Sequence, residues 1–390
     1  MRRNLLASRD GWQQIVEKQG LYYHTIDGVP YWDESVYYSF DAGELDPLEK
    51  ATYACNEMCL AAVQHAIDHK LFDRFLISPA FVDFVVNSWE TEEQSIYGRF
   101  DFCCQPSQPP KLLEYNADTP TALLEASVIQ WFWLKDRFPT ASQFNNIHER
   151  LMEVFQVIRG EGLPRFHFAA MKGHLEDYMT VQYLRDVAAQ AGYGETGATY
   201  LDIEDIGWNQ RRRTFTDLQE RSLSAIFKLY PWEWMIREQF GPDLLEGETR
   251  WFEPAWKILL SNKSLLPLLW QLFGADPEKS AYLLPAFWSE EDLKRHLGLS
   301  ASFVKKPILS REGCNITAVD GGRVIAETGG PYGAGPCIWQ QLHRLPNFDG
   351  HFPVLGSWLV NGWACGMGIR EDTTPITGNS SRFVPHVLAK

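Results

Sequence analysis

The stretch that decides the fold is YGRFDFCCQPSQPPKLLEYNAD, which runs from Tyr97 to Asp118. In its first half Arg99 and Asp101 alternate with two phenylalanines, and this period of two predicts a half-buried strand. The proline-rich segment 105–110 that follows is typical of a turn. The alternation then resumes in the returning half. The stretch therefore predicts a β-hairpin with one polar face and one aromatic face.

The polar face of this hairpin carries Arg99, Asp101, Glu114 and Asn116. Two carboxylates and an amide oxygen are hard donors that suit Mg²⁺, which is usually bound together with substrate phosphates. A neighbouring guanidinium can face the negative charge that develops on a phosphoryl or acyl oxygen. Spacing alone leaves a second interpretation open, namely an exposed amphipathic hairpin with a surface ion pair.

A second cluster, further along the chain, is electropositive. Lys263 opens a helical segment, 264–273, and Lys306 lies beside another lysine in an otherwise apolar strand. One of two adjacent lysines in a strand points inward, and an inward lysine needs a partner such as a nucleotide phosphate. In the segment 310–315, which contains Gly313, backbone N–H groups are candidates for phosphate contacts. The other interpretation is a pair of lysines that snorkel from an edge strand.

The composition argues against several classes of partner. Acidic residues outnumber basic ones, 50 to 36, and the formal net charge is −14. Nucleic-acid binders and proteins of anionic membrane surfaces need a basic footprint, so we expect neither partner. The seven cysteines are scattered and no secretory segment is visible, so we expect a cytoplasmic protein. The apolar run VIQWFWL, 128–134, ends at a lysine and predicts a buried helix rather than a membrane span.

The apolar pattern changes along the chain and predicts three regions, whose expected roles come from the polar clusters that they contain. Residues 1–95 form an N-terminal helical region that packs on the core, with helices at 47–75 and 79–89. Residues 96–245 form an α/β region that binds substrate and metal. Residues 246–390 form a nucleotide-binding region with a mainly antiparallel sheet, whose strands we expect at 303–309, 315–319, 323–327, 338–342, 353–360 and 364–370. Adjacent glycines at 321 and 322 predict a tight hairpin turn.

Five segments of the chain resemble one family, the synthetase domain of glutathionylspermidine synthetases and their single-domain bacterial relatives. They are RFDF with KLLEYNADTPT, then EPAWKILLSNKSLLPLLW, FVKKPILSREGCNI, IWQQLHRLP and GIRED, and they keep this order over nearly the whole chain. The resemblance implies an α+β protein with an ATP-grasp fold in permuted order. Metal ligands then come early in the chain and nucleotide lysines come late.

The resemblance also implies roles for individual residues. The Mg²⁺ ligands are Asp101, Glu114 and Asn116, and Arg99 contacts the transferred phosphate and the reacting carboxylate. The ATP phosphates are held by Lys263 and Lys306, and the adenine pocket is lined by Gln340 and Gln341. Residues that match substrate contacts are Thr119, Thr121, Glu176, Asp177 and Arg370.

The implied reaction joins a carboxylic acid to an amine. The carboxylate attacks the γ-phosphate of ATP to give an acyl phosphate, and the amine then displaces phosphate to form an amide. The implied substrates are a glutathione-like peptide acid and a polyamine or related amine. Bifunctional members of the family carry an amidase domain for which 390 residues leave no room, so no hydrolytic back-reaction is expected.

Two other functions stay open at this stage. The first is a protein that binds nucleotide or peptide without turnover. The second is a carbohydrate hydrolase that uses the acidic residues and some of the fifteen tryptophans. A hydrolase needs no nucleotide, so stabilisation by Mg-ATP would count against it.

Overall fold

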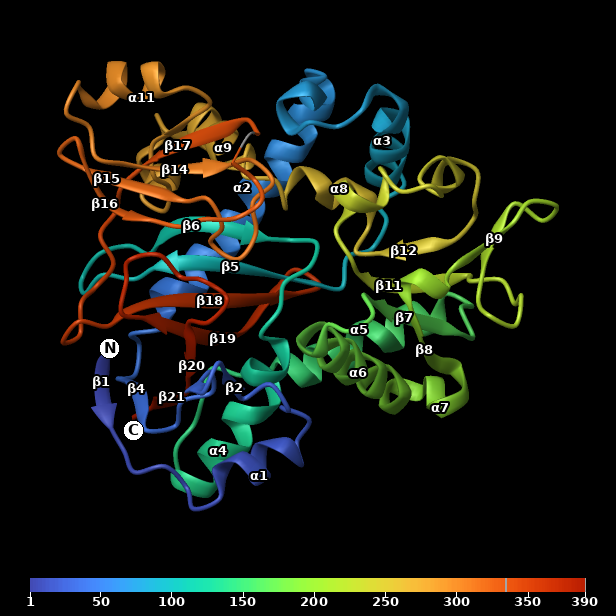
Figure 1. Cartoon of the computed structure of the whole chain (residues 1–390), viewed down its shortest axis with the longest axis horizontal. Helices are drawn as coiled ribbons and strands as arrows, with labels where there is room; N and C mark the ends of the chain where they lie inside the picture. Colours follow the sequence, from blue (N-terminus) through green and yellow to red (C-terminus); the bar gives the residue numbers. More distant parts are fainter. Residues whose placement is uncertain (334, 390) are drawn as a thin grey trace.

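A five-stranded antiparallel sheet with strand order β20-β19-β18-β5-β6 forms the centre of the molecule (Figure 1). The structure is a computed structural model that describes residues 1–333 and 335–389. The strands of the sheet are β5 (Tyr97–Cys103), β6 (Lys111–Asn116), β18 (Phe352–Val360), β19 (Trp363–Asp372) and β20 (Arg382–Val384). The predicted hairpin is therefore present, and it pairs through β5 with a strand from the last part of the chain.

A second antiparallel sheet lies beside the central one and has the order β13-β17-β14-β15-β16. Its strands are β13 (Ala286–Phe287), β14 (Phe303–Pro307), β15 (Thr317–Asp320), β16 (Arg323–Glu327) and β17 (Cys337–Gln341). The six strands predicted after residue 300 are all confirmed, with ends that differ by at most two residues. Gly321 and Gly322 form the turn between β15 and β16, with φ values of +55° and +79°.

A four-stranded parallel sheet, β12-β11-β7-β8, forms the α/β part of the molecule at the right of Figure 1. Its strands are β7 (Phe166–Ala170), β8 (Ala198–Asp202), β11 (Ala225–Leu229) and β12 (Arg250–Phe252). Helix α6 (Leu175–Ala188) connects β7 to β8, and α5 (Ile147–Gly160) packs against α6. Parallel strands need such crossovers, and this part of the molecule has the α/β character expected within residues 96–245.

The remaining elements surround these three sheets. Strands β1 (Arg2–Leu5), β4 (Val36–Phe40) and β21 (His386–Leu388) form a small sheet in which both ends of the chain take part. Two-stranded ribbons are formed by β2 (Thr25–Ile26) with β3 (Val29–Pro30) and by β9 (Gly207–Asn209) with β10 (Thr214–Thr216). The other helices are α1 (Trp12–Glu17), α2 (Asp46–Asp68), α3 (Val82–Glu90), α4 (Gln130–Arg137), α7 (Gly194–Gly197), α8 (Trp232–Met235), α9 (Leu265–Phe273), α10 (Pro277–Ser280) and α11 (Glu290–Leu297).

Two predictions about helices were wrong in part. The first helix stops at Asp68 instead of continuing to Phe75, because Lys70 takes a left-handed conformation with φ +54° and a 3₁₀ turn follows. The apolar run 128–134 is helical but is not buried on all sides, since Trp131 and Phe132 are 40% and 42% exposed. A run of apolar residues hides the helix period, and only the neighbours of the helix decide which side is covered.

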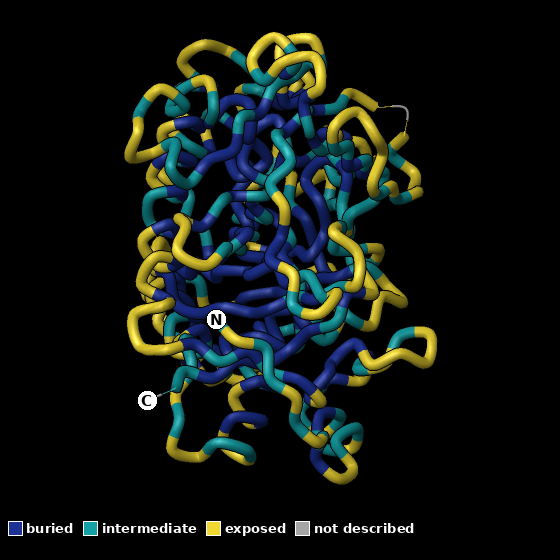
Figure 2. Tube along the Cα trace, turned by 90° about the vertical axis from the view of Figure 1, so that its left-hand side faces the viewer, coloured by how far each residue is buried: buried dark blue, intermediate teal, exposed yellow. Residues whose placement is uncertain are grey.

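The buried residues are continuous through the sheets, and the exposed ones lie in the peripheral loops (Figure 2). One apolar cluster packs α2 against the central sheet and α9 against α2 and the second sheet, and a second cluster fills the space between the central sheet and the parallel one. Among the described residues, no helix has the length and apolar character needed to cross a bilayer.

Candidate active site

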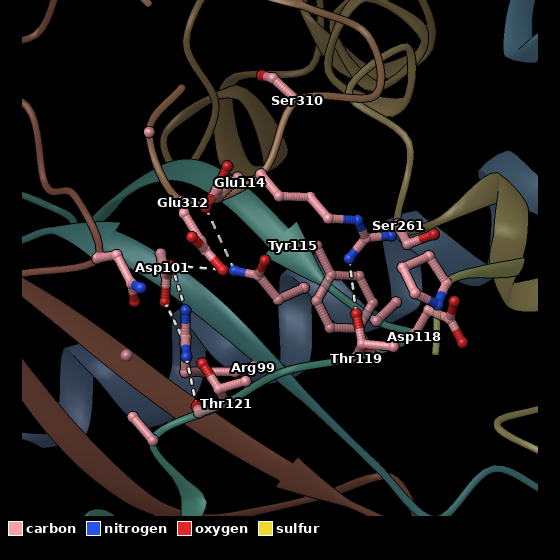
Figure 3. Close-up of a pocket in the computed structure, with 18 of the residues that line it drawn as sticks. Arg99, Asp101, Glu114, Tyr115, Asp118, Thr119, Thr121, Ser261, Ser310 and Glu312 are labelled. Atoms are coloured by element: carbon pink, nitrogen blue, oxygen red, sulfur yellow. Dashed lines mark hydrogen bonds and ion pairs between the residues drawn. The ribbon is translucent and has the colours of Figure 1, made fainter. Parts of the chain in front are cut away.

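The register of β5 with β6 decides which side chains meet. Asp101 lies opposite Glu114, and Arg99 lies opposite Asn116, so all four predicted polar side chains share one face of the hairpin. On the other face Phe100 stacks on a tyrosine of β6 with ring centroids 3.8 Å apart and planes within 10°. The aromatic face is buried in the core, and it fixes the polar face toward the main cavity (Figure 3).

The three predicted metal ligands converge in the structure. The side-chain nitrogen of Asn116 lies 3.0 Å from a carboxylate oxygen of Asp101 and 3.3 Å from one of Glu114. Oxygen and nitrogen of an amide are assigned from the hydrogen-bond pattern, and half a turn of this amide presents its oxygen instead. The described residues contain no group of three or more His, Cys, Asp and Glu side chains arranged for a metal ion. Two carboxylates and one amide nevertheless fit Mg²⁺, which keeps waters and takes further oxygens from phosphates.

Arg99 is held by a two-pronged contact with Asp101, with N–O distances of 2.7 and 2.9 Å. Its third donor reaches the backbone carbonyl of Thr121 at 2.6 Å, as the dashed lines of Figure 3 show. Burial alone would lower the pKa of Arg99, but the charge of Asp101 outweighs burial and raises it. Arg99 is therefore a fixed cation in the cavity wall, as the transfer of a negatively charged group requires.

The two predicted nucleotide lysines approach the predicted metal ligands from the turn before α9, which carries Lys263, and from β14 of the second sheet, which carries Lys306. The ammonium of Lys263 lies 3.2 Å from Glu114 and donates to the carbonyl of Ser310 at 2.5 Å. Burial alone would raise the pKa of Glu114, but the charges of Lys263 and Lys306 outweigh it and hold that pKa at about 2. Glu114 is thus ionised at any ordinary pH, as a metal ligand must be.

Lys306 is the inward member of the lysine pair, as the strand pattern predicts, and Lys305 is exposed. The Lys306 ammonium donates to the carbonyl of Leu113 at 3.0 Å and to the side-chain oxygen of Gln340 at 2.7 Å. Burial lowers the pKa of Lys306 to about 8 against the opposing charge of Glu114. Such a partly desolvated lysine gains more from a phosphate than a solvated one does.

A second cavity lies next to the hairpin and is lined by both predicted adenine residues, Gln340 and Gln341. The amide of Gln340 is occupied on both sides, because it accepts from Lys306 and donates to the carbonyl of Leu112 at 3.2 Å. In this structure the Gln340 side chain therefore orients the ammonium group of Lys306. Gly313 lies where the two cavities meet, at φ +69°, and a Cβ there would collide with the carbonyl of Thr377.

The five predicted substrate residues lie on the far side of the main cavity, and four of them line it: Thr119, Thr121, Asp177 and Arg370. Glu176 does not line the cavity but directly precedes Asp177, which does. The guanidinium of Arg370 donates to the carbonyls of Gly378 at 2.8 Å and Ser381 at 3.0 Å. The structure thus brings all five residues to one side of the β5–β6 hairpin.

This side of the cavity has an acidic end. Burial, with the charge of Glu176, raises the pKa of Asp177 to about 7. Burial also raises the pKa of Glu176 itself. A third carboxyl group, that of the fully buried Glu125, accepts the hydroxyl of Tyr31 at 2.6 Å, and burial raises its pKa to about 7. Of the three, Asp177 lines the cavity, and a cationic ligand there would favour its ionised form.

Three residues near the site were missed in the sequence analysis: Glu125, Glu233 and Arg311. Glu125 lies inside an apolar helical run, and Glu233 lies in a short segment without a motif. Arg311 belongs to segment 310–315, for which only backbone contacts were predicted. Its guanidinium donates to Glu233 at 2.6 and 3.1 Å and to the hydroxyl of Thr119 at 2.6 Å. The only sequence signal for Arg311 was the nearby pair Lys306-Pro307, which indicated that this part of the chain faces the site.

The sequence matches the family model described as glutathionylspermidine synthase preATP-grasp over residues 3–389. The chain belongs to this family. A protein from Haemophilus influenzae named "Putative acid--amine ligase" is 40% identical over 386 residues, which cover 96% of this chain and 95% of the relative. The trypanothione synthetase of Crithidia fasciculata is 29% identical over 325 residues.

This second alignment covers 76% of the chain and 48% of the trypanothione synthetase. Among solved structures, a glutathione synthetase-like effector from Globodera pallida superposes with a TM-score of 0.56 at 10% identity. That superposition covers 97% of this chain and 98% of the effector, and it supports the similarity of fold alone. The glutathionylspermidine synthase family predicted from five sequence segments is therefore confirmed, and the fold mixes helices with sheets as expected.

Proposed function

We propose that this chain is an ATP-dependent carboxylate–amine ligase that works through an acyl phosphate. The observation that carries the proposal is the junction of two cavities. Asp101, Glu114, Lys263 and Gly313 line both of them, so two carboxylates and one lysine meet there, and Lys306 lines the second cavity. The phosphates of a nucleotide bound in one cavity would lie at this junction and reach an acceptor bound in the other. Members of the family with ligase and synthetase names support the same chemistry.

The second cavity is the proposed nucleotide site. Its walls are largely apolar, with Leu113, Leu284 and Ile316, and it ends at Lys263 and Lys306. An apolar slot that leads to fixed cations suits a base followed by phosphates. In this proposal the metal ligands precede the nucleotide lysines in the sequence, which is the permuted order of the ATP-grasp fold. The three-region division of the chain belongs to the same proposal.

The first step is phosphoryl transfer. A carboxylate oxygen of the acid attacks the γ-phosphorus of ATP, the bond from that phosphorus to the bridging oxygen breaks, and ADP leaves. Lys263, Lys306 and Arg99 hold and neutralise the phosphate oxygens during transfer, which is mainly electrostatic and positional catalysis. Mg²⁺ held by Asp101, Glu114 and Asn116 would supply further charge neutralisation at the phosphates.

The second step is amide formation. The amine nitrogen attacks the acyl carbon, a C–N bond forms, the C–O bond to the phosphate breaks, and phosphate and one proton leave. Arg99 lies close enough to the Thr119–Thr121 segment to stabilise the oxyanion of the tetrahedral intermediate. Glu176 and Asp177 hold the remaining charges of a cationic amine at the acidic end.

The substrate classes follow from the family name and the acidic end together. We propose a glutathione-like peptide acid, contacted by Thr119, Thr121 and Arg370, and a polyamine or related amine at Glu176 and Asp177. The family description and the trypanothione synthetase relative support this choice. A cytoplasmic location remains a prediction from the sequence.

Phosphate release, screened over a matrix of peptide acids and amines, tests the proposed function. We expect release that needs Mg-ATP, an acid and an amine together, and a new amide product by mass spectrometry. E114Q should abolish this release. Tight ATP binding with no ADP formed across the matrix would favour a binding protein instead. Hydrolysis of a carbohydrate without nucleotide would favour the hydrolase.

A further inference from the structure

Arg311 reaches from the nucleotide side of the main cavity to its substrate side. Its loop follows β14 and is anchored at both ends, because Ser310 accepts Lys263 at 2.5 Å and Gly313 packs on Thr377. From this loop the guanidinium extends to the Thr119 hydroxyl at 2.6 Å. Arg99 contacts the carbonyl of Thr121, so the two arginines flank the Thr119–Thr121 segment. This segment is where the proposed acid binds.

Glu233 supplies most of the contacts that hold Arg311 there. One carboxylate oxygen of Glu233 accepts two N–H groups, at 2.6 and 3.1 Å, and the residue is only 5% exposed. Burial alone would lower the pKa of Arg311, but the charge of Glu233 outweighs burial and raises it. A long side chain in a cavity loses much rotamer freedom when it is held in one place. The Glu233 contact removes that freedom before any substrate arrives.

The element that carries Glu233 is itself fixed by a buried ion pair. Glu233 lies in the first turn of α8, where the N–H of Trp232 donates to the carboxylate of Asp118 at 2.9 Å. The same carboxylate accepts the ammonium of Lys228 at 2.7 Å, and both side chains of that pair are fully buried. Asp118 directly precedes Thr119. A chain of contacts therefore runs from Asp118, just after the β5–β6 hairpin, through α8 to Arg311. From Arg311 it returns to Thr119.

We propose that Glu233 is a positioning residue, which holds the Arg311 guanidinium beside Thr119 so that it neutralises the acyl phosphate and the oxyanion formed from it. This inference rests on the proposed ligase function. In it Arg311 contacts the reacting groups, and Glu233 acts only through Arg311.

The test is a double-mutant cycle with E233Q, R311A and the double variant. We expect E233Q to lower kcat roughly 10- to 100-fold, because a charged contact to Arg311 becomes a neutral one. The KM for ATP should stay within about twofold. In the R311A background E233Q should have almost no further effect, since the residue through which it acts is gone.

A second measurement needs no turnover. Calorimetry of inorganic phosphate binding to the Mg-ADP-loaded protein should give affinities that fall by a similar factor in E233Q and R311A. If wild-type protein makes no amide but E233Q and R311A weaken phosphate binding equally, the proposed function fails and the positioning role stands.

Stability effects are separated by a matched control. Glu34 is 1% exposed and pairs with the buried Arg9 at 2.8 Å, and neither residue lines the main cavity or the nucleotide cavity. E34Q should therefore lower Tm and leave kcat and phosphate affinity unchanged. Additive effects of E233Q and R311A would overturn the proposal. So would a lower KM for the acid in E233Q with kcat retained, because Glu233 would then compete with the substrate for Arg311.

Discussion

Lys305 and Lys306 are neighbours in the sequence with opposite environments, and they form a natural pair for mutagenesis. Lys306 is 8% exposed and lines the proposed nucleotide cavity, whereas Lys305 is exposed to solvent. We expect K306A to reduce kcat/KM for ATP roughly 10- to 100-fold, which is the range for loss of one charged hydrogen bond. K305A should change it less than twofold by the same reasoning. Equal effects in steady-state kinetics would contradict the assignment of Lys306 to the phosphates.

The raised pKa of Asp177 predicts how amine binding depends on pH. Burial and Glu176 raise this pKa to about 7, so below pH 7 the carboxyl group is largely protonated. A cationic amine favours the ionised form, and binding below pH 7 therefore releases a proton. The affinity for amine should rise with pH up to about 7, by at most about tenfold per pH unit, and then level off.

The corresponding variant is D177N, in which the KM for amine should lose this dependence between about pH 5.5 and 7.5. D186N is the matched control, because Asp186 lies on the same helix but is exposed and paired with Arg185. A pH profile for D177N that keeps the wild-type slope would show that another group titrates.

For individual residues, the sequence pattern predicted the position of a side chain where its contacts are local in the chain. The period of two in 97–116 is sufficient to place Arg99, Asp101, Glu114 and Asn116 on one face. Arg311 could not be assigned in the same way, because its partners Glu233 and Thr119 lie 78 and 192 positions away in the chain. The hydrogen bond from Lys306 to Gln340 likewise could not be predicted, because it depends on the pairing of β14 with β17.

Strand β18 shapes the site without contributing a charged group to it. Gly356 lies opposite Asp101 in the register of β18 with β5, and a Cβ at this position would lie 2.8 Å from Cδ of Arg99. We expect G356A to displace Arg99 and to lower kcat at least about tenfold, in line with loss of one preorganised charge. The measurement is kcat together with Tm.

The control for G356A is G366A in the neighbouring strand β19. A Cβ at Gly366 would lie 2.6 Å from a side-chain carbon of Ile147 in the core, away from the cavity. G366A should therefore lower Tm while the folded fraction keeps its kcat. A fall in Tm without a fall in kcat for G356A would show that Arg99 tolerates the methyl group.

Element positions were predicted well and element partners were not. The strands from 303 to 372 agree with the periodic pattern of the sequence to within two residues. The pairing of β5 with β18 had no local signal, because strand pairing depends on the packing of the whole chain. The exposure of Trp131 and Phe132 has the same cause.

The two cavities open between different sheets, so nucleotide binding should stabilise the molecule as a whole. The central sheet provides Asp101 and Glu114, and the segments around the second sheet provide Lys263 and Lys306. Mg-ATP at a hundredfold excess over Kd should add about 2.7 kcal/mol to the free energy of unfolding. Differential scanning calorimetry should detect this as a higher Tm.

E114Q should lose most of that stabilisation, and K305A should keep it. A Tm that Mg-ATP leaves unchanged in the wild type, at concentrations that saturate turnover, would contradict a nucleotide site between the sheets. ADP without Mg²⁺ should raise Tm less than Mg-ATP, because the metal ligands and the γ-phosphate contacts are then unused.

The central sheet joins strands that leave the ribosome at very different times. The hairpin β5–β6 is made early, yet its neighbour β18 and the strands β19 and β20 come from residues 352–384, and β21 closes the small terminal sheet with β4. During synthesis the edge of the hairpin at β5 therefore stays unpaired until residues 352–360 have been translated. A nonsense mutation between Asn116 and Phe352 would leave every proposed metal ligand in the sequence and remove the strand that pairs with β5.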